Sequence, residues 1–463
     1  MKEVSDGQSG GRAMRPLAAT VIGWGCLVAA VPVATYMLLN HGTAIAAAGV
    51  VVCLALLAVP RPDLALLLLL GIVPVAAVVD SGGVALPLVA AGVGLVLFRV
   101  TLRGFRLRVH LALIAVTAFA VTWSFLLPQV TLLMDRSWSE MASLLVGLGL
   151  LAASAVAPPD PRSVGRLVAG SGAGVAGYLL VGGEYVDDRL TGLGLNPNYL
   201  GAMLALALVA AVGLARLNRS WVWLLPALPC AAAILETRSR GAFLMVAAGL
   251  ACVLLVGRPL RHKVVIALTI LAVATALPGT LDAVEGNLTG HRTSTELSTN
   301  SDVRKQVALL AARVALDHPV RGIGYGVFPG YAQSPSALGI YINTHNDYLR
   351  LAAEAGLGTL ALFVALLWLG LGRRCTADQA ILRSLGVAYS VGLLFANTLS
   401  TLLVTAPFWV SLGCLLAHST RSRPTSSFVT SPALGEAQCR TVRPRSVRAG
   451  VSPSAGTGND GDS

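Results

Sequence analysis

Two arginines in the run TRSRG are the residues best suited to holding a phosphorylated substrate. Arg238 and Arg240 lie directly before an apolar segment. A guanidinium offers several N–H donors in a fixed planar fork, which suits a diphosphate. The alternative is that both arginines only anchor the protein among lipid headgroups, as arginines near the hydrocarbon boundary often do.

A second group of candidates lies about a hundred residues further on. Ser301 is the predicted N-cap of a helix that carries Arg304 in its first turn, where a cation opposes the helix dipole and an anionic partner would compensate. The alternative is a solvated face shared with Lys305. His345 and Asn346 open the next apolar run. An imidazole titrates near neutral pH and can take a proton from a sugar hydroxyl, although a polar end-cap is the alternative.

The composition of the chain indicates the kind of scaffold that must position these residues. The 463 residues are 55% hydrophobic and 12% charged, whereas soluble domains carry about 25% charged residues. Many apolar runs have the length of a membrane span. The sequence therefore predicts an all-α integral membrane protein, a polytopic helical bundle of about 12–14 transmembrane helices. Apolar runs fall near 17–39, 43–59, 64–79, 84–98, 109–127, 140–156, 164–181, 197–215, 221–235, 241–256, 263–277, 347–371, 382–399 and 401–417.

The positions of the basic residues orient this bundle. With 1–16 as a cytoplasmic N-terminal segment and 17–418 as the membrane domain, most arginines fall in inner loops, as the positive-inside rule requires. The short outer loops hold Arg136, Arg189, Arg238 and Arg240. The net charge of +12 is explained in this way, so we expect no nucleic-acid partner. The same count places 278–346 outside as one long extracytoplasmic loop and makes 419–463 a disordered cytoplasmic tail.

The long loop contains a short amphipathic helix and a glycine-rich turn. One face of the helix is marked by Val303, Val307, Leu310 and Val314, and it would lie on the membrane surface or cap the bundle. The run GIGYG at 322–326 lacks a preceding strand, so we interpret it as a tight turn that delivers Phe328 onto the bundle and not as a phosphate loop. Upstream, Asn196-Pro197-Asn198 predicts a turn followed by a helix start.

The sequence predicts no metal centre and no cofactor. The seven cysteines are scattered without metal-type spacing, and we interpret them as small apolar residues. His291, His318 and His345 have no ligand spacing either. Asp187 and Asp188 are predicted to be solvated loop acids.

In their order along the chain, these pieces resemble the O-antigen ligase and polymerase family of bacterial membrane proteins. The resemblance covers roughly residues 190–370. It consists of NPNYLG at the start of one span, TRSRG before another, and HNDYL at 345–349 followed by Glu354 and Gly356. Between them lies an Arg-led helix followed by PVRGIGYGVF, which resembles the family's P-x-x-G-x-G-x-x-F turn.

This resemblance implies a metal-independent, inverting glycan transfer at the outer face of the cytoplasmic (inner) membrane, in cell-surface polysaccharide biosynthesis. The donor would be a glycan on undecaprenyl diphosphate, and the acceptor a glycan, a lipid or a protein. Arg240 and Arg304, with Arg238 helping, would hold the diphosphate. His345, next to Asn346, would orient or deprotonate the acceptor hydroxyl. Ligation and polymerisation both stay open.

Two other functions remain as alternatives. A transporter or flippase of lipid-linked glycans could use the same bundle, although it would be expected to carry ionisable residues along a path through the membrane. The predicted spans are nearly free of such residues. A non-catalytic scaffold of an envelope complex is the second alternative, and it would not need His345.

Overall fold

The protein is described by a computed structural model, which places residues 43–78, 82–102, 108–130, 138–255, 294–372 and 375–418. These ranges belong to one compact unit. Several predictions lie outside the described residues: the N-terminal segment 1–16, the spans at 17–39 and 263–277, His291, Arg136, the tail at 419–463 and the first part of the long loop.

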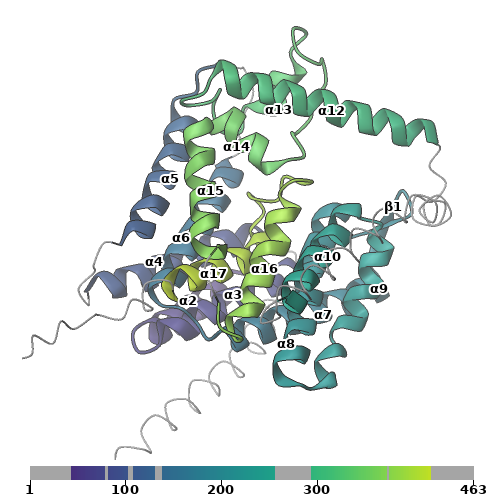
Figure 1. The fold of residues 1–463 in the computed structure, drawn as a ribbon. Helices are drawn as coiled ribbons and strands as arrows, with labels where there is room; N and C mark the ends of the chain where they lie inside the picture. Colours follow the sequence, from purple (N-terminus) through teal and green to yellow (C-terminus); the bar gives the residue numbers. More distant parts are fainter. Residues whose placement is uncertain are drawn as a thin grey trace, which may run out of the picture. The chain divides into compact units, whose positions relative to one another are not determined.

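The described chain is almost entirely helical (Figure 1). In chain order its elements are α2 (Thr43–Ala58), α3 (Pro62–Val78), α4 (Gly82–Leu102), α5 (Val109–Leu126), α6 (Trp138–Val156), α7 (Pro161–Gly182), β1 (Glu184–Val186), β2 (Arg189–Thr191), α8 (Pro197–Asn218), η1 (Trp221–Leu224), α9 (Ala227–Thr237), α10 (Arg240–Leu255), α12 (Ser294–Asp317), α13 (Phe328–Gln333), α14 (Asp347–Ala355), α15 (Leu357–Leu371), α16 (Gln379–Gly392) and α17 (Leu402–His418).

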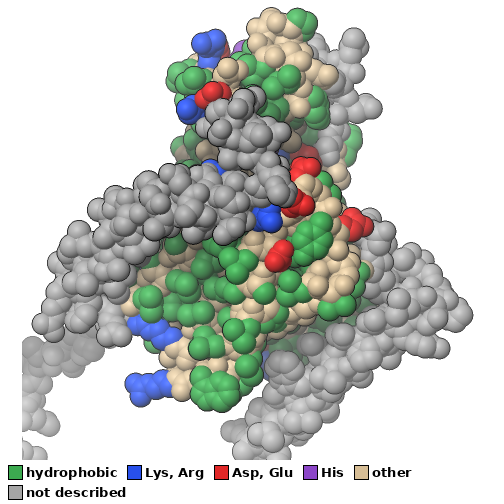
Figure 2. All heavy atoms as spheres, turned by 90° about the vertical axis from the view of Figure 1, so that its right-hand side faces the viewer, with side chains coloured by type: hydrophobic (Ala, Val, Ile, Leu, Met, Phe, Trp, Pro, Cys, Tyr) green, Lys and Arg blue, Asp and Glu red, His purple; other side chains and the backbone are tan. Residues whose placement is uncertain are grey.

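The helices have the length and surface of a membrane bundle. Among the described residues, five helices are long and apolar enough to cross a membrane, namely α4 to α8, and several shorter apolar helices pack with them. On the face shown in Figure 2, hydrophobic side chains form a band with charged side chains above and below it. Side chains such as Val181, Leu228 and Leu235 are exposed, which suits contact with lipid and not with water. The predicted all-α polytopic membrane fold is confirmed.

Two pairs of predicted outer segments meet at one end of the bundle. Ser124, near the end of α5, donates a hydrogen bond to the Glu354 carbonyl of α14, and Tyr199 at the start of α8 donates to the Asn397 carbonyl, 2.7 Å away, in the segment after α16. The predicted inner segments meet at the other end, where Arg162 forms an ion pair with Asp378 at 2.9 Å. This grouping is what the alternation of arginines requires.

The helix in the long loop is longer than the sequence suggested. α12 has 24 residues and begins at Ser294, so the prediction that Ser301 is its N-cap was wrong. Its predicted apolar face does pack inward, because Val307 and Val314 are buried in one hydrophobic cluster together with Phe328. α12 therefore caps one end of the bundle over α13 and α14 (Figure 1).

Two predicted spans are interrupted. The run 347–371 is broken at Gly356, whose φ of 89° ends α14 before α15 begins. α14 is amphipathic and buries Asp347, Arg350 and Glu354, so it is a short end-piece and not part of a lipid-facing span. The run 382–399 ends as a helix at Gly392. The following residues, 393–401, form a non-helical segment that we call the α16–α17 loop.

The segment before α8 folds as its turn residues dictate. Asp187 and Asp188 both have left-handed φ values, 51° and 56°, and connect β1 to β2 in a two-residue hairpin turn. They are exposed, as predicted. Asn196 then caps α8, because its side chain accepts hydrogen bonds from the backbone N–H groups of Asn198 and Tyr199 at 3.0 and 3.1 Å. The predicted helix start at Asn196-Pro197 is confirmed.

Candidate functional site

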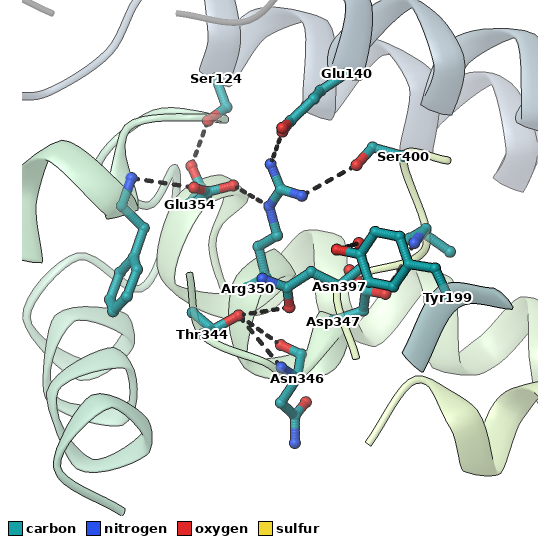
Figure 3. A network of polar contacts seen from close by, with 12 residues as sticks. Ser124, Glu140, Tyr199, Thr344, Asn346, Asp347, Arg350, Glu354, Asn397 and Ser400 are labelled. Carbon is teal, nitrogen blue, oxygen red and sulfur yellow. Dashed lines mark hydrogen bonds and ion pairs between the residues drawn. The ribbon is translucent and has the colours of Figure 1, made fainter. Parts of the chain in front are cut away.

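The α16–α17 loop is the scaffold on which the predicted site residues converge. Thr344, directly before His345, places its hydroxyl 3.0 Å from Oδ1 of Asn397 in this loop. Directly after the His-Asn pair, the backbone N–H of Asp347 donates to the Leu393 carbonyl at 2.8 Å. Figure 3 shows Thr344, Asp347 and Asn397 close together at one end of α14. The loop therefore fixes both sides of the turn that carries His345.

The arginine run TRSRG lies next to the same loop. Arg238 ends α9 and Arg240 begins α10, where it is exposed. A Cβ atom added to Gly241 would lie 3.5 Å from Cβ of Phe395 in the α16–α17 loop. One loop thus contacts the residue after Arg240 and the residues on either side of His345.

The start of α8 holds the arginine run in place. Arg189 donates from Nε to the Thr237 carbonyl at 2.9 Å and from Nη2 to Oδ1 of Asn198 at 3.0 Å. Ser239 donates to the same Asn198 oxygen at 3.3 Å. Gly201 allows the close packing behind this contact, because a Cβ atom there would come within 2.9 Å of the Ser239 side chain. Arg189, an arginine on the predicted outer side, therefore has a structural role that the sequence did not show.

Arg238 differs from Arg189 in how its guanidinium is satisfied. Its backbone is left-handed, with a φ of 47°, and the side chain is half-buried. Its Nη1 atom is buried and makes no hydrogen bond to any described residue. A buried donor without a partner costs about 1–3 kcal/mol, and an anionic ligand at this position would remove that cost.

His345 is held in a strained conformation close to a positive charge. Its φ of 53° lies in the left-handed region, which costs a non-glycine residue on the order of 1–3 kcal/mol. Burial lowers the pKa of its imidazole, and the charge of Arg304 lowers it further. The structure thus brings Arg304 and His345 within electrostatic reach, and both effects favour the neutral imidazole, the state that accepts a proton.

Asn346 has a structural role. Its Oδ1 atom accepts a hydrogen bond from the backbone N–H of Leu349 at 3.0 Å, which makes it the N-cap of α14. A polar end-cap was the alternative role considered for His345, and in the structure Asn346 has that role. The carboxamide nitrogen of Asn346 remains the group that could contact a substrate.

Sequence reasoning missed a buried ion-pair network in α14, the helix that follows the His-Asn pair (Figure 3). Arg350 donates from Nε to Glu354 at 2.9 Å, and from Nη2 to Glu140 of α6. It donates from Nη1 to Ser400 of the α16–α17 loop at 3.2 Å, and its guanidinium lies 4.9 Å from the ring centroid of Tyr325. The spacing of Arg350 and Glu354, four residues apart on one helix, was the available signal.

The predicted glycine turn completes the other end of α14. Ile323 and Gly324 donate backbone hydrogen bonds to the carbonyls of Ala353 and Glu354 at 2.9 and 3.0 Å. Phe328 then donates its backbone N–H to the Glu354 carboxylate at 3.0 Å. The prediction of a tight turn that buries Phe328 is confirmed, although Phe328 packs under α12 and not into the main bundle.

Within the described ranges, no three metal-ligating side chains gather at one place. The site presents guanidinium groups on one side and an imidazole on the other, at one end of a helical bundle. Such a pair can stabilise an anionic leaving group and accept a proton from a hydroxyl.

Residues 224–364 match the family model Wzy_C, described as O-antigen ligase. The matched range contains Arg238, Arg240, Arg304, His345 and Asn346, and it supports an O-antigen ligase-like family for this multi-pass membrane protein. The range is less than half of the chain, and it leaves out α8 with its NPNYLG start. No curated protein matches the sequence significantly.

Proposed function

From an O-antigen ligase-like family as premise, we propose that this protein transfers a glycan from undecaprenyl diphosphate to an acceptor hydroxyl. The reaction takes place at the outer face of the cytoplasmic membrane, in the biosynthesis of a cell-surface polysaccharide. The acceptor is a glycan, a lipid or a protein, and the protein acts as a ligase or a polymerase.

In the proposed mechanism the imidazole of His345 accepts the proton of the acceptor hydroxyl. The freed oxygen attacks the anomeric carbon of the donor sugar from the face opposite the diphosphate, which inverts the configuration. The bond between the anomeric carbon and the diphosphate oxygen breaks, and undecaprenyl diphosphate leaves. Arg240 and Arg304, with Arg238, stabilise the negative charge that grows on the leaving group. The step requires neither a metal ion nor a nucleotide.

The observation that carries this proposal is the convergence on the α16–α17 loop. Phe395 of this loop lies against Gly241, beside Arg240, while Asn397 of the same loop binds Thr344, beside His345. Residues a hundred positions apart in the sequence are thereby held at one end of the bundle. The Arg304 charge that lowers the pKa of His345 supports the same grouping.

The buried charges do not favour the transporter alternative. Asp347, Arg350 and Glu354 are all buried in α14, which is a short end-piece before α15, and α15 itself carries no ionisable residue. They lie at one end of the bundle, and Arg350 is satisfied by Glu354, Glu140 and Ser400. Charges that line a transport path would instead be spread through the depth of the membrane.

The decisive experiment measures lipid-linked glycan and surface polymer in a deletion strain complemented with variants. We expect His345→Ala to leave glycan on undecaprenyl diphosphate although the protein still inserts. We expect Arg240→Lys to lose most of the activity, because an ammonium group lacks the planar fork. His318→Ala is the matched control, since this histidine binds Gln129 at 2.7 Å in the same outer region and has no proposed role.

The accumulated material distinguishes the two possible reactions. Single repeat units on the lipid indicate a polymerase, and full-length chains on the lipid indicate a ligase. Normal transfer by His345→Ala would exclude the proposed base. A normal rate of glycan transfer by Arg240→Lys would mean that Arg240 only anchors the protein among lipid headgroups.

The side of the membrane is tested independently with single cysteines in a cysteine-free background. Ser336 is exposed in the segment after α13, and Ala377 is exposed at the opposite end of the bundle. An impermeant maleimide added to intact cells should label Ser336→Cys and leave Ala377→Cys unlabelled until the membrane is opened. The reverse pattern would place the site in the cytoplasm and contradict the proposal.

A further inference from the structure

The conformation of His345 depends on a local hydrogen-bonded bridge around it. The residues on either side are joined, because the backbone N–H of Asn346 lies 3.4 Å from the Thr344 hydroxyl and the Asn346 carbonyl lies 3.0 Å from it. His345 stands inside this bridge with its left-handed φ of 53°. The bridge closes the chain around the one residue of the turn whose backbone is strained.

The bridge is anchored from outside by Asn397 (Figure 3). Its Oδ1 atom lies 3.0 Å from the Thr344 hydroxyl, and both side chains are buried, each 3% exposed. The backbone of Asn397 is itself fixed, since its carbonyl accepts the hydrogen bond from Tyr199 of α8. A strained residue persists only where its surroundings over-determine it, and Thr344 and Asn397 are the side chains that do so here.

We propose that Thr344 and Asn397 are positioning residues that hold His345 in the left-handed conformation in which its imidazole meets the acceptor hydroxyl. The inference rests on the proposed function of His345 as the proton acceptor. Neither residue needs to touch the substrate. They determine the position of the imidazole. They do not change its basicity or the binding of the diphosphate by the arginines.

This role predicts a separation between binding and turnover. Proton transfer needs the base within about 3 Å of the hydroxyl, so a displacement of about 1 Å lowers the rate by up to ~100-fold. The diphosphate would be held by arginines at the turn between α9 and α10 and in α12, whereas the Thr344 hydroxyl is hydrogen-bonded to Asn346 and Asn397. Loss of the bridge should therefore slow transfer while affinity for the donor headgroup is kept.

The test compares Thr344→Val, which keeps the shape but removes the hydroxyl, with Thr344→Ser, which keeps the hydroxyl. Asn397→Leu removes the bridge from the other side. Thr117→Val is the matched control, because Thr117 is equally buried at 3% and its hydroxyl donates to the Leu113 carbonyl of its own helix at 2.7 Å. Three quantities are measured on the full chain: transfer in the complemented deletion strain, binding of undecaprenyl diphosphate, and the rate at which diethyl pyrocarbonate modifies His345.

We expect Thr344→Val and Asn397→Leu to lower transfer by roughly 10–100-fold, with undecaprenyl diphosphate bound as in the wild type and a changed rate of His345 modification. Thr344→Ser should restore both transfer and modification. Wild-type transfer by Thr344→Val, or a loss of transfer equal to that of Thr117→Val, would overturn the proposal. So would an unchanged modification rate. Normal transfer by His345→Ala would instead overturn the proposed function itself, so the two failures are distinguishable.

Discussion

The buried pair of Arg350 and Glu354 gives a stability prediction that follows directly from its environment. The Arg350 side chain is 4% exposed and the Glu354 side chain is fully buried. Among the described residues, Arg350→Met leaves the buried Glu354 carboxylate with the Phe328 N–H as its one remaining hydrogen-bond donor. Removing one member of a buried ion pair costs about 3–5 kcal/mol, because the remaining charge is uncompensated. We expect a loss of that size in the free energy of unfolding.

The exposed pair of Arg162 and Asp378 provides the control. Its side chains are 45% and 48% exposed, so Arg162→Met should cost no more than about 1 kcal/mol. The free energy of unfolding is measured for the full chain in mixed micelles by denaturant titration. A cost for Arg350→Met as small as that for Arg162→Met would refute the reasoning.

A double variant separates the lost attraction from the stranded charge. In Arg350→Met combined with Glu354→Gln, the carboxylate is gone and the amide can still accept from Phe328. We expect this variant to be less destabilised than the sum of the two single changes, by about 1–3 kcal/mol. Strict additivity would mean that the two side chains are not energetically coupled.

Two further predictions concern the turns around the site. Gly322 and Gly339 both have left-handed φ values, 64° and 68°, but only at Gly322 would a Cβ atom meet the backbone of α14, at 2.3 Å. In Gly339→Ala the unfavourable φ alone should lower the free energy of unfolding by ~1–2 kcal/mol. Gly322→Ala should lower it clearly more, and equal losses would contradict the close approach of Gly322 to the α14 backbone. Separately, the transfer rate should fall as the pH drops through the pKa of His345, because the protonated imidazole cannot act as a base. The Arg304 charge lowers that pKa, so Arg304→Gln should move the acid limb of the pH–rate profile to higher pH. The control Lys305→Gln, one residue further along, should leave the acid limb in place. Equal shifts in the two variants would mean that only the net charge of the protein matters.

The sequence was sufficient for the features that depend on local rules. Apolar length predicted the helices, and Asn196 with Pro197 predicted where α8 begins. The spacing of Val307 and Val314 predicted the buried face of α12. Each of these is a property of one segment and its own side chains, so no partner had to be known. The start of α12 was misplaced because Ser301 satisfies the same cap pattern inside a helix that begins earlier.

The sequence was not sufficient for contacts between distant segments. The α16–α17 loop was hidden because Gly392 is followed by Leu393, Leu394 and Phe395, which extend the apolar run although the helix has ended. The polar residues that follow Phe395 were the available sign that the helix had ended, and one of them, Asn397, binds Thr344. Nothing in either segment alone identifies that pairing. The Arg350–Glu354 pair was visible as a spacing on one helix, but its burial depends on α5 and α6.

The arginines on the predicted outer side differ in how their guanidinium groups are satisfied, and this difference separates a lipid anchor from a ligand-binding residue. A headgroup anchor extends its guanidinium into the interface, where lipid and water satisfy it. Arg189 fits neither role, because it is fixed by Thr237 and Asn198. Arg238 has a strained backbone and a buried Nη1 atom that no described residue satisfies. Strain together with an unmet donor is costly unless something completes the site. A phosphate oxygen supplied by the donor is the group that would complete it, and this is why we propose that the diphosphate binds at the turn between α9 and α10.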